Sequence, residues 1–227
     1  MTYDLLIGDR SYSSWSLRGW LLFSAFDIPV RVHMAELYDD GFTAKVAEWS
    51  PIAGTVPTAR APGGAVWTDS IAIAEGLAEA HPEAGHWPAD PVARACARSL
   101  VAEMHGGFGA LRSACPMNLR VAWSGFEPSE AVLADLARLD LLWSHARGMA
   151  GDGPWLFGEY SAADAFYAPI AIRIAGYGLP VDEAARAYVD AHLAHSLIRE
   201  WRDAGEARDR TLHVYDQDLP TAPFPMP

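Results

Sequence analysis

The chain has 227 residues, of which 51% are hydrophobic and 20% charged, a balance typical of a folded protein with a substantial core rather than of a disordered chain. Its 17 basic and 29 acidic residues give a net charge of -12. Because nucleic acids and anionic membranes are bound through basic surfaces, we expect neither as a partner.

The cysteines and the hydropathy of the sequence indicate which covalent links, metals and cellular locations to expect. The two cysteines, Cys96 and Cys115, stand in no CxxC or metal-ligand pattern, which indicates small buried side chains rather than a disulfide, and we expect no metal. The sequence opens with no charged-then-apolar leader and holds no run of about 18 apolar residues. We therefore expect a soluble cytoplasmic protein.

The first 80 residues alternate strand and helix patterns. In chain order, they predict a strand at 3–8, a helix at 14–26, a strand at 30–35, a short helix at 42–49, strands at 56–61 and 65–68, and a helix at 70–80. The two later strands flank Pro62-Gly63-Gly64, which is a hairpin signal. Asp69 is the expected N-cap of the last helix. The predicted order is β-α-β-α-β-β-α.

After a linker at 83–91, the pattern is helical almost to the end. It predicts a long helix at 92–111 and further helices at 129–150, 162–175, 183–194 and 197–204. Ser161 and Asp164 are spaced as a capping box at the start of the helix 162–175. The last nine residues, LPTAPFPMP, include four prolines, so this tail is expected to lie extended on the surface.

The stretch RSYSSWSLRGWLL, residues 10–22, places four serines at the start of the first helix. One interpretation is capping, in which a serine oxygen accepts a free N–H group of the first turn. The other is a binding site, because the N-terminus of a helix attracts a negatively charged group. Pro57 and the pair Asp69-Ser70 add a strand edge and a second helix start, which could hold the ammonium and carboxylate of a zwitterionic peptide.

Three motifs, taken in their order and spacing, resemble a known family. The turn SSWSLRGWLL, the VPT before the hairpin and the helix DSIAIAEGLAE together resemble the thioredoxin-like N-terminal domain of cytosolic glutathione transferases. SAADAFYAPI resembles the N-capping box of that family's helical domain. The serine pair before an aromatic residue and Ser-x-Arg is most similar to the serine-type classes, in particular the zeta class, in which a cysteine stands at the place of Trp15.

The resemblance covers the chain apart from the proline-rich tail and implies its fold. This fold is an α/β thioredoxin-like N-terminal domain followed by an all-α helical bundle. We assign residues 1–82 to the glutathione-binding domain, 83–91 to the linker, 92–215 to the helical domain and 216–227 to the tail. The resemblance also implies a cytoplasmic homodimer with a role in detoxification.

The resemblance assigns roles to residues of the first domain. Ser13, with Ser14 as its rival, would donate its hydroxyl to the glutathione sulfur, unless both serines only cap the helix. Thr55 and Val56 would meet the cysteinyl part beside a cis Pro57, and Trp15 would border the ligand. Asp69 and Ser70 would hold the γ-glutamyl end.

The second substrate is expected between the domains, against the segment EMHGGFGALRSACPMNLR. His105, Phe108 and Arg112 recur at spacings of three and four, so they would share one helix face with Met117 in the loop beyond. An arginine there suits a substrate that bears a carboxylate. The alternatives are that Arg112 is solvated or paired and that His105 is a core histidine.

The predicted function is a glutathione-dependent transferase, in which the glutathione thiolate attacks a small electrophile. One alternative is an isomerase that uses glutathione as a cofactor, as the zeta class does with maleylacetoacetate. Another is a binding or scaffold protein that keeps the fold without turnover. Residues 13–16 include no cysteine, which argues against chemistry that needs a thiol nucleophile of the protein's own.

Overall fold

The computed structural model describes residues 2–150 and 152–226. The first residue of the predicted domain 1–82 and the last of the predicted tail 216–227 therefore lie outside the described residues. The order expected for the first half is confirmed, with a shorter hairpin than predicted. Its elements are β1 (Tyr3–Ile7), α1 (Ser14–Ser24), β2 (Val30–Met34), α2 (Phe42–Ala47), β3 (Thr58–Arg60), β4 (Val66–Trp67) and α3 (Ser70–Ala80).

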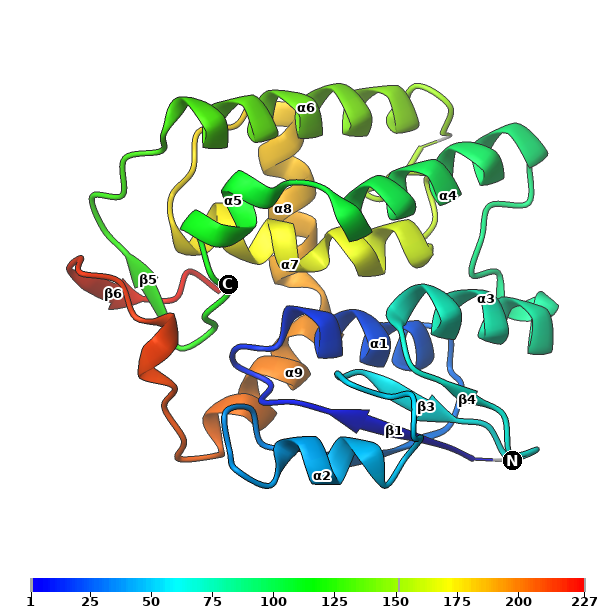
Figure 1. The fold of residues 1–227 in the computed structure, drawn as a ribbon. Helices are drawn as coiled ribbons and strands as arrows, with labels where there is room; N and C mark the ends of the chain where they lie inside the picture. The colour runs from blue at the N-terminus through cyan, green and yellow to red at the C-terminus, as the bar shows by residue number, and fades with distance from the viewer. Residues whose placement is uncertain (1, 151, 227) are drawn as a thin grey trace.

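These strands form one mixed sheet in the order β2-β1-β3-β4, in which β1 and β2 are parallel and the other pairs antiparallel. Side chains of β1 alternate between the two faces of the sheet. Leu5 and Ile7 belong to the main core with α1 and α3, whereas Leu6 packs with Val46 of α2 and Val56. Helices therefore cover both faces, which explains why Leu5, Leu6 and Ile7 of β1 are all apolar although they alternate in direction (Figure 1).

The second half is mainly helical. A short 3-10 turn at Pro82–Ala84 leads to α4 (Pro91–Gly106), α5 (Gly109–Ala114), α6 (Glu130–Arg147), α7 (Ala162–Gly176), α8 (Glu183–Ala194) and α9 (Ser196–Glu206), and a second 3-10 turn follows at His213–Tyr215. Nearly all of α7 is buried, and the capping box of Ser161 and Asp164 at its start is confirmed. None of the helices that the structure describes combines the length and the apolar character needed to span a bilayer.

The prediction of one long helix at 92–111 is wrong. Gly107 ends α4 in an extended conformation, and Phe108 lies in the left-handed region with φ 56° before α5 begins. Gly106 and Gly107 weaken the helix there, because glycine has little helix propensity and great backbone freedom. His105, Phe108 and Arg112 consequently do not share one helix face.

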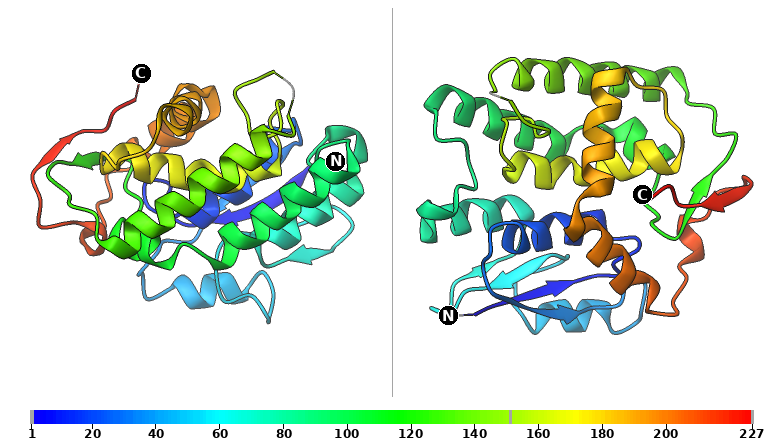
Figure 2. Two further views of the ribbon diagram at one scale, coloured as in Figure 1. Left: turned by 90° about the horizontal axis from the view of Figure 1, so that it is seen from above. Right: turned by 180° about the vertical axis from the view of Figure 1, so that it is seen from behind.

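The prediction for the tail is confirmed in part. Its backbone is extended, but residues Thr221–Pro223 form β6, which pairs antiparallel with β5 (Val121–Trp123), and Phe224 is only 5% exposed. The tail therefore packs against the helical half instead of lying loosely on the surface (Figure 2). Three-residue strands about a hundred positions apart leave too little local pattern to be recognised in a sequence.

Candidate functional site

Two adjoining cavities lie where α1 begins. The larger has a volume of about 460 Å³ and the smaller about 240 Å³. They share Trp15, Thr55 and Val56 in their linings, so they lie side by side. The larger cavity is lined by Tyr12, Ser13, Ser14, Trp15, Leu37, Phe42, Thr55, Val56, Gly109, Arg112, Ser113, Pro116, Arg173 and Tyr215; Pro57, Thr68 and Asp69 complete the smaller one.

The two candidate serines line the larger cavity in different ways. Ser13 is the N-cap of α1: its hydroxyl oxygen accepts the N–H of Ser16 at 3.3 Å and lies 2.7 Å from the Ser16 hydroxyl. Ser16 in turn accepts the N–H of Gly8 at 2.9 Å. Ser14 is the first residue of the helix, and its hydroxyl has no hydrogen-bond partner within residues 2–150 and 152–226. The capping interpretation is thus confirmed for Ser13, while Ser14 takes no part in the cap.

The segment before β3 carries the expected cis peptide bond between Val56 and Pro57. Neither the N–H nor the C=O of Val56 is hydrogen-bonded to another residue of the described chain. Pro57 packs against Gly19 of α1 so closely that a Cβ atom on this glycine would lie 2.7 Å from the proline ring. A glycine at this place lets α1 and the Val56-Pro57 segment approach each other.

Asp69 and Ser70 meet at the start of α3, beside the smaller cavity. One carboxylate oxygen of Asp69 accepts the N–H of Ile71 at 2.7 Å, and the other lies 3.5 Å from Nε2 of His105. The Ser70 hydroxyl is fully buried and has no partner in the part of the chain that the structure describes. The ring of His105 contacts Trp15 edge-on at 4.9 Å, so His105 lies on the Asp69 side of the site.

Two arginines, Arg112 and Arg173, line the larger cavity, and a third, Arg18, is buried next to its lining. The Trp15 ring contacts two of the three, with its centroid 4.7 Å from Cζ of Arg18 and 4.8 Å from Cζ of Arg112. Arg173, on α7, is 6% exposed and donates to the carbonyl groups of Cys115 at 2.8 Å and Pro169 at 3.2 Å.

The electrostatics of these arginines are unusual because none of them forms an ion pair with a described residue. Burial is the main cause that lowers the pKa of each guanidinium, and repulsion by the charge of Arg112 lowers those of Arg18 and Arg173 further. The pKa of Arg173 falls to about 10, and that of Arg18 falls well below its usual range. Because a guanidinium stays protonated at neutral pH, the wall of the cavity is positively charged.

The structure brings together most, but not all, of the residues singled out from the sequence. Phe108 and Met117 lie in the core and line neither cavity. Conversely, Tyr12, Arg173 and Tyr215 line the larger cavity but were missed. A signal for Arg173 exists in the sequence, because it is the only charged residue in the apolar run AFYAPIAIRIAG; Tyr215 gives none.

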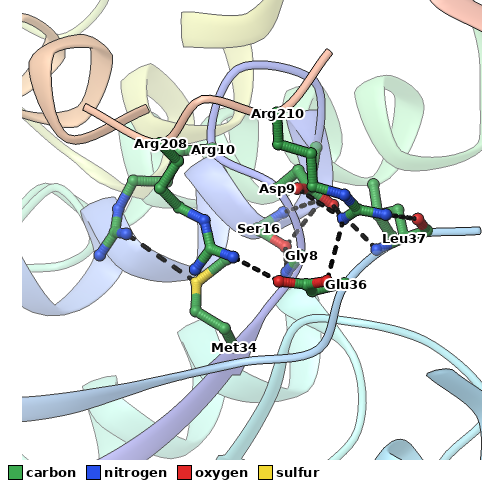
Figure 3. A network of polar contacts seen from close by, with 10 residues as sticks. Gly8, Asp9, Arg10, Ser16, Met34, Glu36, Leu37, Arg208 and Arg210 are labelled. Carbon is green, nitrogen blue, oxygen red and sulfur yellow. Dashed lines mark hydrogen bonds and ion pairs between the residues drawn. The ribbon is translucent and has the colours of Figure 1, made fainter. Parts of the chain in front are cut away.

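The loop between β1 and α1, which carries the serines, is fixed by the segment that follows α9 (Figure 3). Asp9 is 4% exposed, and both of its carboxylate oxygens accept from Arg210 at 2.8 Å. Arg210 also donates to the C=O of Leu37 at 2.7 Å, and the N–H of Leu37 donates to Asp9 at 2.8 Å. In addition, Trp201 of α9 donates to the C=O of Arg10 at 2.8 Å. Residues late in the chain therefore hold two walls of the cavity in place.

Part of the chain is similar to a known protein family, and its fold is similar to solved structures. Residues 12–80 match the family model of the glutathione S-transferase N-terminal domain. The search of curated proteins found no match. Among solved structures, a glutathione transferase homologue from Burkholderia GL BGR1 with bound glutathione is 23% identical, and the match covers 92% of this chain and 100% of that one with a TM-score of 0.68.

Two further structures are similar over most of their length. Glutathione transferase Omega 2S from Trametes versicolor, in complex with 2,4-dihydroxybenzophenone, is 20% identical over 91% of this chain and 95% of that one, with a TM-score of 0.67. A glutathione transferase homologue from Sulfitobacter, with bound glutathione, is 18% identical over 90% and 98%, with a TM-score of 0.59. At these identities the likeness concerns the fold. The resemblance to glutathione transferases is confirmed in the fold: the chain has the glutathione transferase fold, and its residues 12–80 match the model of the glutathione S-transferase N-terminal domain.

Proposed function

We propose that the protein is a glutathione-dependent transferase that holds glutathione across the two cavities and uses its sulfur to attack a small electrophile. The observation that carries this proposal is the convergence of two helix starts and the unbonded backbone of Val56 on two adjoining cavities. Two similar structures were determined with bound glutathione, which supports glutathione as the ligand.

Two of the three units of glutathione, the γ-glutamyl and the cysteinyl, find chemical partners in this arrangement. The γ-glutamyl ammonium would pair with the Asp69 carboxylate, and its carboxylate would accept from the Ser70 hydroxyl and the free N–H groups at the start of α3. The cysteinyl unit would pair with the N–H and C=O of Val56 as an extended strand does. The sulfur would then lie at the N-terminus of α1, beside Ser13 and Ser14.

The chemical task at this place is to ionise a thiol whose free pKa is about 8.5. Ser13 is the proposed donor, since its oxygen already accepts an N–H of the helix and its proton can turn from Ser16 to the sulfur. The helix N-terminus and the arginine charges favour the thiolate as well. Lowering the pKa by about two units corresponds to about 2.7 kcal/mol, which one charge-assisted hydrogen bond and a helix dipole can supply.

The reaction then follows from the thiolate. The thiol proton passes to solvent, the sulfur forms a bond to the electrophilic carbon, and the leaving group departs with its electron pair. This assignment is serine-type, and Ser14, whose hydroxyl is not used in the cap, is the competing donor.

A titration of the bound thiol tests this function. Thiolate absorbance of the glutathione complex is followed from about pH 5 to about pH 9 in the wild type, Ser13→Ala, Ser14→Ala and the control Ser99→Ala, whose hydroxyl is exposed on α4. We expect the thiol of bound glutathione to have a pKa of about 6.5 in the wild type. In Ser13→Ala it should rise by about two units, back to the value of free glutathione. Restoration in Ser14→Ala alone would transfer the role to Ser14. An unshifted thiol in the wild type would contradict the function.

A further inference from the structure

Two arginines face the larger cavity without an acidic partner, in a chain whose net charge is -12. Arg112 and Arg173 line the cavity, and its lining contains no aspartate or glutamate. Acidic residues outnumber basic ones by 29 to 17, so the positive charge of this cavity lining is opposite in sign to the net charge of the chain. A field of this sign attracts anions.

Both guanidinium groups are held by backbone carbonyls instead of carboxylates. Arg112 donates to the carbonyls of His105 and Gly107, and Arg173 to those of Cys115 and Pro169. These contacts orient the side chains but leave their charges uncompensated. Burying an unpaired cation is unfavourable, and an anion in the cavity would relieve it.

A buried hydroxyl in the lining of the same cavity is a second, independent sign of a ligand. Tyr12 is 2% exposed, lines the cavity and has a hydroxyl without any partner among the described residues. Its ring packs against Tyr215, with the centroids 4.9 Å apart. Buried hydroxyls normally find a hydrogen-bond partner, so Tyr12 adds an unpaired neutral donor to a lining that already holds two cations.

The placement of the arginines distinguishes this anion from the α-carboxylate of glutathione. The start of α3, which suits that carboxylate, borders the smaller cavity. Arg112 and Arg173 line the larger cavity from α5 and α7, two helices of the second half of the chain, whereas Asp69 lines the smaller one.

We propose that the second substrate carries a carboxylate or a similar oxyanion, which Arg173 and Arg112 bind so that the electrophilic carbon faces the glutathione sulfur. This inference rests on the proposed function for the identity of the nucleophile. A planar guanidinium can hold a carboxylate through two parallel hydrogen bonds. Arg173, fixed on the buried helix α7, supplies a rigid anchor, while Arg112 closes the pair from α5.

The test compares two electrophiles that differ in charge, 4-chloro-3,5-dinitrobenzoate and 4-chloro-3,5-dinitrobenzamide, each corrected for its uncatalysed reaction with glutathione. The wild type is expected to prefer the acid by about tenfold or more in kcat/KM. Arg173→Gln should reduce this preference to about twofold by raising KM for the acid, and Arg173→Lys should retain part of it. Arg112→Gln, a less buried site, provides a second variant in case Arg173→Gln does not fold. The control is Arg94→Gln, an arginine that also bonds only backbone carbonyls but lies outside both cavities.

Two further measurements separate the possible sources of the anion. The Kd of glutathione should stay within about twofold in Arg173→Gln. If the affinity for glutathione instead falls as much as the affinity for the acid, the arginine binds a carboxylate of glutathione, and the proposal is overturned. No preference for the acid in the wild type would overturn it too. The affinities of 4-nitrobenzoate and 4-nitrobenzamide are compared by calorimetry. This measurement needs no turnover, so it tests the anion site even if the pKa of the bound glutathione thiol is not shifted. Equal binding of the two compounds would contradict the anion site.

Discussion

Single side chains at this site combine structural and chemical roles. Ser13 caps α1, and Asp69 caps α3, yet both face a cavity. The sequence predicted these residues because cap positions have a recognisable local pattern. It did not predict Tyr12, Arg173 or Tyr215 as site residues, because an isolated side chain in a helix or a turn does not indicate which cavity it reaches. Arg112 was singled out by its spacing from His105 and Phe108, although the helix predicted for these residues was wrong.

The two roles of Asp69 can be separated at the level of one residue. Asparagine is as good an N-cap as aspartate, so Asp69→Asn should keep α3 stable within about 0.5 kcal/mol while it removes the charge offered to an ammonium group. We expect the Kd for glutathione to rise about tenfold, measured by calorimetry, with the thermal midpoint as the folding check.

The matched control is Asp90→Asn at the N-cap of α4, which lines neither cavity. It should leave glutathione affinity unchanged. Equal affinities for the wild type and Asp69→Asn would show that the carboxylate does not bind the ligand.

Whole elements are positioned by close contacts that the sequence indicates only in part. The short apolar run of β1 and the cap of α3 gave both elements correctly. The break between α4 and α5 was missed, because two glycines weaken a helix without showing where the chain will turn. The pairing of β5 with β6 was missed as well, since it depends on long-range contacts between short segments.

The contact of α1 with the Val56-Pro57 segment gives a prediction at this scale. Gly19→Ala would place a Cβ atom 2.7 Å from the Pro57 ring, so one of the two elements has to move. We expect a loss of about 1–3 kcal/mol in unfolding free energy and weaker glutathione binding, because Val56 moves with Pro57. Denaturant unfolding and calorimetry measure the two effects.

Gly106→Ala is the comparison, since a Cβ on this helical glycine meets nothing within 4 Å. It should be neutral or stabilising by up to about 1 kcal/mol. If Gly19→Ala behaves in the same way, the close approach does not constrain the site.

At the scale of the whole molecule, the chain joins its two ends at the site. The Asp9–Arg210 pair links residues 201 positions apart, and α9 lies against the first half through Trp201 and Trp20, whose ring centroids are 5.2 Å apart (Figures 1 and 2). No local sequence pattern predicts an ion pair between residues so far apart. The fold was predictable from its motifs, whereas this connection became visible only in three dimensions.

Removal of Arg210 from the Asp9–Arg210 pair should lower the unfolding free energy substantially. Arg210→Met leaves the Asp9 carboxylate buried with the N–H of Leu37 as its remaining partner in Figure 3, so we expect a loss of about 2–4 kcal/mol in unfolding free energy. Arg31→Met, which breaks the exposed pair of Arg31 and Asp4, should cost less than about 1 kcal/mol. Urea denaturation of both variants measures the difference, and equal losses would contradict the role given to Asp9.

The same pair has a consequence for the order in which the protein becomes functional. Contacts between residues so distant in the chain form late, because closing a long loop has a high entropic cost. The loop with the serines is therefore fixed only after both halves have folded. On heating, the segment after α9 can detach before the core melts, and exchange of the Leu37 amide hydrogen would reveal this opening. Loss of glutathione binding should accordingly precede loss of helical structure.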